Sequence, residues 1–542
     1  MTTLPQQNPP ATPSRDAAAL DRRAFVKTVS TAAIGLAAGG SVLGAATAAA
    51  PSAAPVTASG PRRRYAIVGC GGRHRMYLTA ILENYKGIAE LVGVCDMNEG
   101  RAKRSQKTAA KAGVQVKAYY PSKPNPATPD FNRLLPEFDT MIKETRPDVV
   151  IVTTVDTSHD LYLVRAMELG CDTITEKPMT ITAEKCQRII DTQKRTGKHV
   201  RVTFNYRYSP PRTQVKDILM SGEIGDVLSV DFQWLLNTRH GTDYFRRWHS
   251  NKKNSGGLML HKATHHFDLV NWWLSASPVS VTAVGKREFY TPEMARRMGL
   301  SGPHERCMTC PEKTACGFYI DMPGSPGLRS LYLDNEKYDG YLRDRCVFRP
   351  DIDIEDTMNV TVKYDTGPTL NYSLNAFNAW EGYQIAFNGT KGRLEHSIVE
   401  AIYVNGADSD EAQGAIKAGG TKIRVIPLRD GGRDIKPWKG TGGHGGGDTV
   451  MLDDIFLPNP PADRYQRNSD ERGGAASILI GAAANISFVT GKTVHMADMV
   501  KNLARPAYPP MPTNTDPVPM PRQLKDNVLN RPNPAPEAKK TS

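Results

Sequence analysis

A lysine and two histidines stand at positions where acid–base chemistry is a natural use for them. Lys177 follows Glu176 at the end of a β-rich run, and His261 and His265 lie four residues apart. Oxidation of a secondary alcohol needs a base for the hydroxyl proton and a cation that stabilises the developing alkoxide. Because histidine titrates near neutrality, His265 suits the first role, and Lys177 suits the second.

The stretch 260–273 around these histidines contains no helix breaker, so we predict one helix. His261, His265 and Asp268 would then share a face at i, i+4 and i+7. Two interpretations compete with catalysis: a satisfied polar core, and a zinc site built on histidines at i and i+4. No HExxH glutamate stands between the histidines, which weakens the zinc interpretation.

A glycine-rich turn follows the β-rich run 65–68 and precedes a helical stretch. Gly69 would make the turn and Gly71 would admit phosphates, while the helix N-terminus supplies N–H groups. His74 occupies the third glycine position of GxGxxG. Asp96, at the end of the next β-rich run, would accept both ribose hydroxyls and repel a 2′-phosphate, which favours NAD over NADP. The alternative for Asp96 is a helix N-cap.

These residues require a parallel sheet to position them. β-rich runs at 65–68, 91–94, 149–154 and 172–175 alternate with helical stretches, which predicts a doubly wound parallel sheet. After residue 202 the runs lengthen, at 228–235, 360–364 and 369–374, and indicate a large, mainly antiparallel open sheet. We therefore predict an α/β protein with an N-terminal Rossmann domain at 62–180 and a C-terminal α/β domain for substrate and oligomerisation at 181–500. A Pro-rich tail at 507–542 would be an extended strap or disordered.

The motifs together resemble the Gfo/Idh/MocA family of NAD(P)-dependent sugar and cyclitol oxidoreductases. The resemblance covers roughly residues 62–500 and rests on the GxG turn, Glu176-Lys177-Pro178, the run 205–207, and His265 three residues before Asp268. It implies that Lys177 and His265 line the substrate carbon beside the nicotinamide, and that the open sheet mediates a homo-oligomer, a dimer or tetramer. In that family an aspartate usually stands four residues before the histidine. Here the residue is His261, so the usual carboxylate helper is absent.

Three sets of residues make up the predicted site. The catalytic set is Lys177, His265 and His261; the cofactor set is Gly69, Gly71, Gly72, Arg73, Asp96, Thr154, His159, Glu176, Lys177 and Asn205; the substrate set is Arg207, His240, Tyr244, Trp248 and Asp268. Aromatic faces and polar heads on one loop suit sugar recognition, although a solvated loop is the alternative. Asn205 and Arg207 could equally be buried structural residues. Glu381, after a later strand, could complete the pocket, and the glycine-rich stretch 444–448 is either a flexible loop that delivers His444 to the site or a linker.

The cysteines fall into a scattered group of four and a group inside an insertion at 287–350. Cys307, Cys310 and Cys316 have C-x2-C-x5-C spacing, with Cys346 as a fourth member. Four thiols so placed can hold structural zinc or an iron–sulfur cluster, and we predict such a tetrathiolate site. A pair of disulfides is the alternative in an exported protein.

The first 50 residues read as an export signal. Arg22 and Arg23 precede Phe25 and Lys27, and an Ala/Gly-rich run follows, too weakly apolar for a stable membrane span. This pattern resembles a twin-arginine signal, so we predict recognition by the twin-arginine export machinery and a periplasmic or other extracytoplasmic location. An uncleaved anchor or a chance arginine pair is the alternative.

Composition limits the class of protein. Of 542 residues 39% are hydrophobic and 23% charged, a globular balance that excludes wholesale disorder and a multi-span membrane protein. The net charge of +13 raises nucleic acid as a partner. The basic residues are scattered among carboxylates without a basic run interleaved with aromatics, so we predict no nucleic-acid binding.

Three functions remain open at this point. The first is an oxidoreductase of a sugar, glycoside or cyclitol hydroxyl with tightly bound NAD, because free NAD is scarce outside the cytoplasm. The second is a redox-neutral NAD-dependent glycosidase, in which oxidation, elimination and reduction follow one another and His240, Tyr244 or His265 is the base. The third is a non-catalytic dinucleotide- or sugar-binding protein, which would be expected to lose Lys177 or His265.

Overall fold

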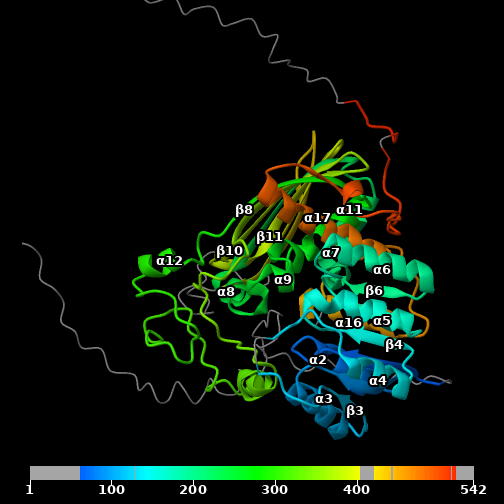
Figure 1. Cartoon of the computed structure of the whole chain (residues 1–542). Helices are drawn as coiled ribbons and strands as arrows, with labels where there is room; N and C mark the ends of the chain where they lie inside the picture. Colours follow the sequence, from blue (N-terminus) through cyan, green and yellow to red (C-terminus); the bar gives the residue numbers. More distant parts are fainter. Residues whose placement is uncertain (1–60, 127–128, 403–419, 441–442, 514, 521–542) are drawn as a thin grey trace, which may run out of the picture.

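The structure is a computed structural model that describes residues 61–520 except 127–128, 403–419, 441–442 and 514 (Figure 1). The predicted signal at 1–50 and the end of the Pro-rich tail lie outside the described residues. Within the described part, the chain forms two sheets with helices packed on them, and an insertion lies to one side of the second sheet.

The first sheet confirms the predicted doubly wound parallel arrangement. Its six strands in the described chain lie in the order β3-β2-β1-β4-β5-β6, and every neighbouring pair is parallel. The sheet continues beyond the predicted domain end at residue 180, because β6 pairs with β5. The strands are β1 (Arg63–Val68), β2 (Ala89–Cys95), β3 (Lys117–Tyr119), β4 (Val149–Val152), β5 (Asp172–Glu176) and β6 (Val200–Thr203).

Helices cover both faces of this sheet because its strands are apolar on both sides. Val68 packs with Phe138 on the face covered by α4, α5 and α6. Tyr65 points to the other face and meets Phe456 at 5.1 Å between ring centroids. The helices are α2 (His74–Thr79), α3 (Glu99–Lys111), α4 (Pro136–Thr145), α5 (His159–Glu168), α6 (Ala183–Thr196) and α16 (Gly443–Phe456).

Helix α16 replaces the loop or linker predicted for the glycine-rich stretch 444–448. Its later residues Met451, Ile455 and Phe456 are buried against the first sheet, so tertiary packing outweighs the low helix propensity of glycine. Tyr85 Oη donates a hydrogen bond to Asp453 Oδ1 at 2.6 Å and fixes the helix to the sheet domain. The side chain of His444 lies outside the described part of the chain.

The second sheet is mainly antiparallel, as predicted. Its nine strands in the described chain run β14-β13-β12-β11-β7-β10-β9-β8-β15, with β7 and β10 parallel to each other. The strands are β7 (Val227–Asn237), β8 (Pro278–Lys286), β9 (Thr357–Tyr364), β10 (Thr369–Asn378), β11 (Trp380–Gly389), β12 (Gly392–Ile402), β13 (Thr421–Pro427), β14 (Arg433–Ile435) and β15 (Val494–His495).

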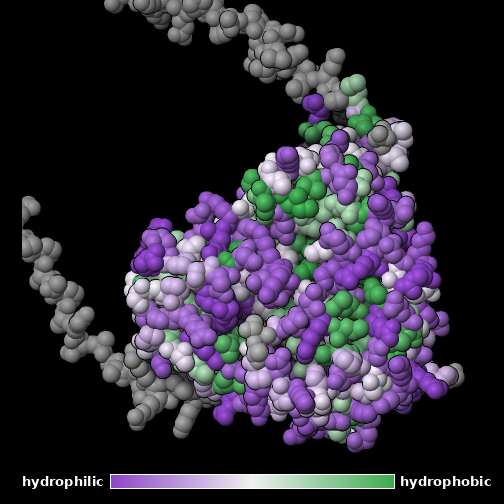
Figure 2. All heavy atoms as spheres, viewed as in Figure 1, coloured by the Kyte–Doolittle hydropathy of each residue, from purple (hydrophilic) through white to green (hydrophobic). Residues whose placement is uncertain are grey.

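One face of the second sheet is covered and the other is open. Residues along β9 and β10 alternate between buried and exposed, and α11 (Thr264–Leu274) and α17 (Glu471–Thr490) pack on the buried face. Among the described helices, α17 alone is long and apolar enough to span a membrane. However, 72% of its most apolar 18-residue segment is buried within the protein. Figure 2 shows polar and apolar side chains mixed over one face of the molecule. Oligomerisation through the open sheet stays a prediction.

Shorter helices carry the region between the sheets and the insertion. They are α7 (Pro210–Met220), α8 (Thr238–Arg246), α9 (Lys252–Ser255), α10 (Leu258–His261), α12 (Pro292–Arg297), α13 (Pro326–Leu331) and α14 (Glu336–Asp339). Helices α12 to α14 belong to the insertion between β8 and β9, which reaches from the second sheet down beside α3 in Figure 1. The first described residues of the Pro-rich tail form an extended strap: Ser275 Oγ donates to Pro509 O at 2.7 Å, and Lys216 Nζ lies 3.1 Å from Met511 Sδ.

The structure does not assemble the predicted tetrathiolate site. Among the described residues, no group of three or more His, Cys, Asp or Glu is arranged to hold a metal ion. Cys307, Cys310, Cys316 and Cys346 are also not disulfide-bonded. Cys307 is instead buried, with Sγ 3.1 Å from Arg246 Nη1, so a guanidinium occupies one approach to this thiol.

A buried ion pair links the first domain to the second. Arg207 donates to both oxygens of Asp268, through Nε at 2.7 Å and Nη2 at 2.6 Å, and each side chain is 1% exposed. The pair joins the turn after β6 to α11. Bidentate geometry of this kind gives strong charge-assisted hydrogen bonds.

We predict that Arg207→Met destabilises the fold by about 3–5 kcal/mol, because it leaves the Asp268 charge buried without its partner. Urea unfolding followed by circular dichroism measures the effect. Arg424→Met, which breaks an exposed Arg–Asp pair, is the matched control and should change stability little. An Arg207→Met protein within about 1 kcal/mol of wild type would contradict the prediction.

Candidate functional site

A cavity of about 680 Å³ lies between the two domains. Its walls are the turn after β1, the carboxyl ends of β2, β4 and β5, and side chains from α8, α10 and α11. In open α/β sheets, ligands bind outside the carboxyl ends of the strands. The cavity therefore occupies the expected place for a dinucleotide and its substrate.

The turn after β1 has the shape that a pyrophosphate needs. Gly69 has φ +90°, and an added Cβ would stand 2.6 Å from the backbone of Thr153, so glycine alone fits there. At Gly71 an added Cβ would meet no other described atom within 4 Å, and this opening faces the cavity together with Gly72. A side chain at either position would fill the space or displace the strand.

Asp96 holds this turn and also lines the cavity. Its Oδ2 accepts from Cys70 N at 2.5 Å and its Oδ1 accepts from Asn98 N at 2.7 Å. The N-cap of α3 is Asn98, which accepts from Arg101 N at 3.1 Å, so the N-cap alternative for Asp96 does not hold. These residues fit NAD: the open turn would admit the phosphates, and Asp96 would accept ribose hydroxyls.

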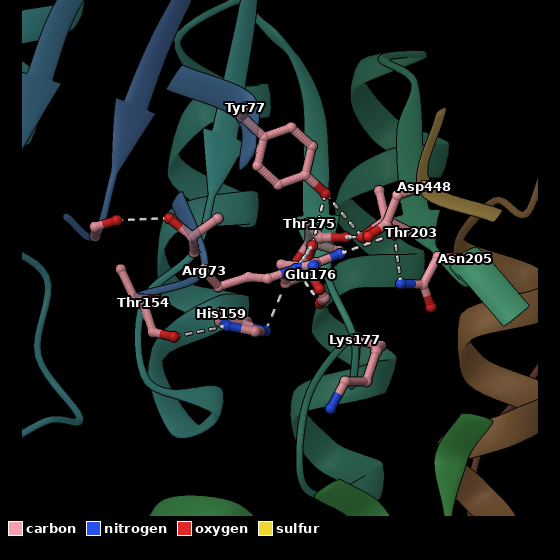
Figure 3. A network of polar contacts seen from close by, with 12 residues as sticks. Arg73, Tyr77, Thr154, His159, Thr175, Glu176, Lys177, Thr203, Asn205 and Asp448 are labelled. Atoms are coloured by element: carbon pink, nitrogen blue, oxygen red, sulfur yellow. Dashed lines mark hydrogen bonds and ion pairs between the residues drawn. The ribbon is translucent and has the colours of Figure 1, made fainter. Parts of the chain in front are cut away.

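A polar network closes one wall of the cavity (Figure 3). Glu176 Oε1 accepts from Arg73 Nε and from Tyr77 Oη, both at 2.7 Å. Asn205 Nδ2 donates to Asp448 Oδ1 at 2.8 Å. Arg73, Glu176 and Asn205 thus lie together as predicted residues of the cofactor site, while Asp448 on α16 was not predicted.

Thr154 and His159 brace the ends of β4 and β5. The ring nitrogens of His159 lie 3.1 Å from Thr154 O and 2.8 Å from Pro178 O. Burial lowers the pKa of His159, which favours the neutral ring. Both residues line the cavity, and His159 acts mainly by holding the backbone that presents Lys177.

Lys177 is held by His261, which in turn is held by Asp156. Lys177 Nζ donates to His261 O at 3.0 Å and lies 3.5 Å from His261 Nε2. His261 Nδ1 lies 2.5 Å from Asp156 Oδ2. The missing family carboxylate at position 261 therefore has a counterpart, because Asp156 reaches the same group from the end of β4.

Burial sets the protonation of this chain of groups. It lowers the pKa of Lys177 to about 8, against the opposing effect of the Asp156 and Glu176 carboxylates. Burial, together with the Lys177 cation, lowers the pKa of His261 well below its usual value. A neutral His261 can donate from Nδ1 to Asp156 and accept at Nε2 from Lys177.

The single helix predicted over 260–273 is wrong, because the chain breaks into α10 and α11 with a turn at residues 262–263. Lys177 Nζ donates to the carbonyl of His261, which in an unbroken helix would accept from His265 N. His265 N donates instead to Lys262 O at 3.3 Å. The hydrogen bond from Lys177 thus interrupts the helix. His261 and His265 still line the same cavity, and His265 stacks on Tyr206 at 4.3 Å between centroids.

Arg207 and Asp268 do not contact the cavity, in contrast to the substrate role predicted for them. They form the buried ion pair described above, and neither belongs to the cavity wall. For Asp268 the physical reason is that the face count at i, i+4 and i+7 assumed an unbroken helix. The polar-core alternative accounts for both residues.

The other predicted substrate residues lie together at the second-domain end of the cavity. Tyr244 Oη lies 2.9 Å from His240 Nε2, and His240 Nδ1 lies 2.8 Å from Glu381 Oε1. Glu381 is 1% exposed, and although burial opposes ionisation, His240 and Lys262 hold its pKa below the usual value. Burial raises the pKa of Tyr244. In this Tyr–His–Glu chain, as in a serine–histidine–aspartate triad, a buried carboxylate orients a histidine that contacts a hydroxyl group.

Trp248 stacks on His249 at 3.6 Å between centroids, and both line the cavity. The His249 ring lies 4.2 Å from that of His261. The zinc interpretation of His261 and His265 finds no support, since no metal-holding group was found in the described part of the chain.

Sequence reasoning missed Asp156 and Lys262, which line the cavity, and Asp448, which accepts a hydrogen bond from the cavity residue Asn205. Asp156 had a usable signal, because it follows β4 at the edge of the sheet where Asp96 and Glu176 also stand. Asp448 had none, since its helix lies more than 200 residues from the strands that it covers.

Two family descriptions match almost all of the described chain. Residues 63–204 match the oxidoreductase family's NAD-binding Rossmann fold, and residues 216–496 match its C-terminal alpha/beta domain. The chain belongs to the Gfo/Idh/MocA oxidoreductase family. The family match and the open turn at Gly71 agree on a dinucleotide as the cofactor.

The chain is similar to proteins with three different names. "Putative oxidoreductase YteT" of Bacillus subtilis is 34% identical over 445 residues, 80% of this chain and 98% of YteT. Inositol 2-dehydrogenase of Salmonella typhimurium is 29% identical over 210 residues, which are 39% of this chain and 54% of that protein. Glycosyl hydrolase family 109 protein 1 of Akkermansia muciniphila is 28% identical over 207 residues, 36% of this chain and 40% of that protein.

We predict that Lys177 titrates near pH 8 in the protein freed of nicotinamide, because burial lowers its pKa to about 8. Competitive acetylation across pH 6–11, read by mass spectrometry of the Lys177 peptide, measures the value. Exposed lysines in the same digest are internal controls and as a class titrate near about 10.4. A Lys177 midpoint shared with those lysines would contradict the prediction.

Proposed function

We propose that this protein is an NAD-dependent oxidoreductase that acts on a secondary hydroxyl of a sugar, glycoside or cyclitol, with its cofactor tightly held. The observation that carries the proposal is the position of Lys177, whose ammonium faces the cavity between the glycine turn and the histidines of α10 and α11. The 29% identity to an inositol 2-dehydrogenase over 210 residues supports a polyol as the substrate class.

NAD, when bound, supplies the hydride acceptor and donor. Lys177 Nζ binds the substrate oxygen and exchanges its proton, and a pKa near 8 suits that task at neutral pH. His261 and Asp156 hold the ammonium and offer the proton a path away from the substrate. His265, stacked on Tyr206, lines the cavity beside them and is the second candidate for the base.

Export is part of the proposal. The twin-arginine pattern in residues 1–50 supports a location outside the cytoplasm, where a resident cofactor must return to its starting redox state in each cycle. Either a second substrate reoxidises it or the reaction is redox-neutral.

The test is to mix NAD-loaded mature protein with a panel of free sugars, cyclitols and glycosides and to follow the absorbance of reduced nicotinamide. We expect reduction by at least one panel member. Lys177→Ala should reduce its NAD at least about 100-fold more slowly, in the range of a lost acid–base group, with the cofactor still bound. Equal rates in Lys177→Ala and wild type, or no reduction by any member and no glycoside cleavage, would contradict the proposal.

A second candidate function is a redox-neutral glycosidase, and the Tyr244–His240–Glu381 chain favours it. Hydride transfer at an alcohol needs one proton-exchanging group, which Lys177 supplies, so a second such chain in the same cavity is surplus to that reaction. The 28% identity to a glycosyl hydrolase family 109 protein over 207 residues is in line with it.

In this scheme Tyr244 removes a carbon-bound proton. Oxidation of one ring hydroxyl to a ketone acidifies the proton on the adjacent carbon, and Tyr244 Oη takes that proton while passing its own to His240. The buried Glu381 carboxylate stabilises the imidazolium that forms. The electron pair of the broken C–H bond expels the aglycone, which leaves with a proton; water then adds to the sugar, and the hydride returns to the ketone.

We predict that Tyr244→Phe separates the two candidates. The variant should lose solvent deuterium incorporation into the sugar by at least about 100-fold, in the range of a lost general base, while single-turnover nicotinamide reduction changes less than about threefold. Wild-type deuterium incorporation in Tyr244→Phe, measured by mass spectrometry of recovered sugar, would exclude Tyr244 as the base. Wild-type protein that incorporates no deuterium and cleaves no glycoside would leave the oxidoreductase alone.

A further inference from the structure

The insertion between β8 and β9 crosses to the first domain at the ribose end of the cofactor site. Residues 331–343 of the insertion, here called the clasp, lie beside the start of α3 (Figure 1). Asn98 and Arg101, which the clasp contacts, follow Asp96 by two and five residues. Since Asp96 is the ribose-binding carboxylate of this fold, the clasp covers that end of the dinucleotide.

The contacts between the clasp and α3 are buried. Asp339, 2% exposed, forms an ion pair with Arg101, 8% exposed. Asn98 Nδ2 donates to Asn335 O at 3.0 Å. Gly100 lies so close that an added Cβ would collide with the Asn335 side chain. A buried pair of opposite charges cannot separate without exposing or orphaning both, so this junction opens rarely.

The clasp also forms part of the cavity itself. Tyr332 and Tyr341 line it, and Tyr341 packs against Phe131 of the first domain at 6.0 Å between centroids. Tyr332 and Tyr341 belong to an apolar cluster that Phe131 and Trp248 join. The clasp therefore adds aromatic walls to the part of the cavity that Asp96 and Arg101 border.

The far side of the clasp is fixed to the second domain. Arg343 Nη2 donates to Asp243 Oδ2 at 2.7 Å, and Arg343 helps to lower the pKa of that carboxyl to about 2 despite its burial. An earlier part of the same insertion is held there too, since Arg246 Nη2 donates to Phe318 O at 2.6 Å. Both partners lie on α8, whose Tyr244 and His240 line the substrate end. The clasp thus spans from the ribose end to the substrate end and joins the two domains across the cavity.

From these contacts we propose that the clasp encloses the dinucleotide and makes NAD a resident cofactor that stays bound between turnovers. It also sets the preference for NAD. Arg101 lies 3.7 Å from Asp96 and would otherwise be a cation available to a 2′-phosphate, but Asp339 already compensates its charge. The inference rests on the proposed function for its cofactor alone and not for its substrate.

The test follows exchange of bound NAD for isotope-labelled NAD in the full mature chain, with no sugar present. Wild-type protein should retain nicotinamide through exhaustive dialysis and exchange it over hours. Asp339→Asn, which removes the charge at constant size, should exchange at least tenfold faster. Asp334→Asn, in an exposed pair on the same segment, is the matched control and should behave as wild type.

A second variant holds the clasp in place. In Gly100→Cys/Asn335→Cys the two side chains stand close enough for a disulfide, and oxidation should slow exchange at least tenfold relative to the reduced form. Wild-type protein with and without reductant controls for the native cysteines. Equal exchange by the oxidised and reduced double variant, with the bond verified by thiol titration, would overturn the inference, as would wild-type exchange within seconds. Because exchange is read without substrate, its failure is separate from a failure of sugar oxidation.

Discussion

A lysine ammonium buried at the seam between two domains is the constraint on which the site depends. Lys177 extends from the end of β5 in the first domain and donates to a main-chain carbonyl of the second. Its charge must be solvated by protein dipoles there, and the carbonyl of His261 is one of them. Taking that carbonyl splits a helix into α10 and α11, and the split points His261 and His265 into the cavity. The same hydrogen bond therefore shapes the cavity and joins the two domains.

Two hydrogen-bonded chains flank the space where substrate would lie. One runs from Asp156 through His261 to Lys177, and the other from Glu381 through His240 to Tyr244. Each places a buried carboxylate behind a histidine and a proton-bearing group in front. The family's usual carboxylate at position 261 is replaced by a longer path, in which the charge comes from the opposite domain. Dinucleotide and sugar chemistry on this scaffold would therefore depend on how tightly the domains close.

Much of the fold and the centre of the site could be predicted from the sequence, because they follow from local patterns. Strand and helix alternation gave the parallel sheet, and the glycine turn with Asp96 gave the dinucleotide end. Lys177, His261 and His265 were found from motif spacing. Asp268 was misplaced because helix geometry was extrapolated across a break at His261, where Lys177 binds the carbonyl from 84 residues away; the sequence left a buried structural role for Arg207 equally open. The cysteine spacing likewise could not show that Arg246 donates a hydrogen bond to the Cys307 thiol.

The position of α16 has a consequence for how the molecule is assembled. The part of one sheet face around Tyr65 in the first domain is covered by residues 451–456, which come from almost 400 positions later in the chain, while the early helices cover the rest. The amino-terminal domain is therefore contiguous in space but not in sequence. A growing chain would carry a partly covered apolar sheet face through most of its synthesis, and the last quarter of the sequence would complete the first domain and the second together.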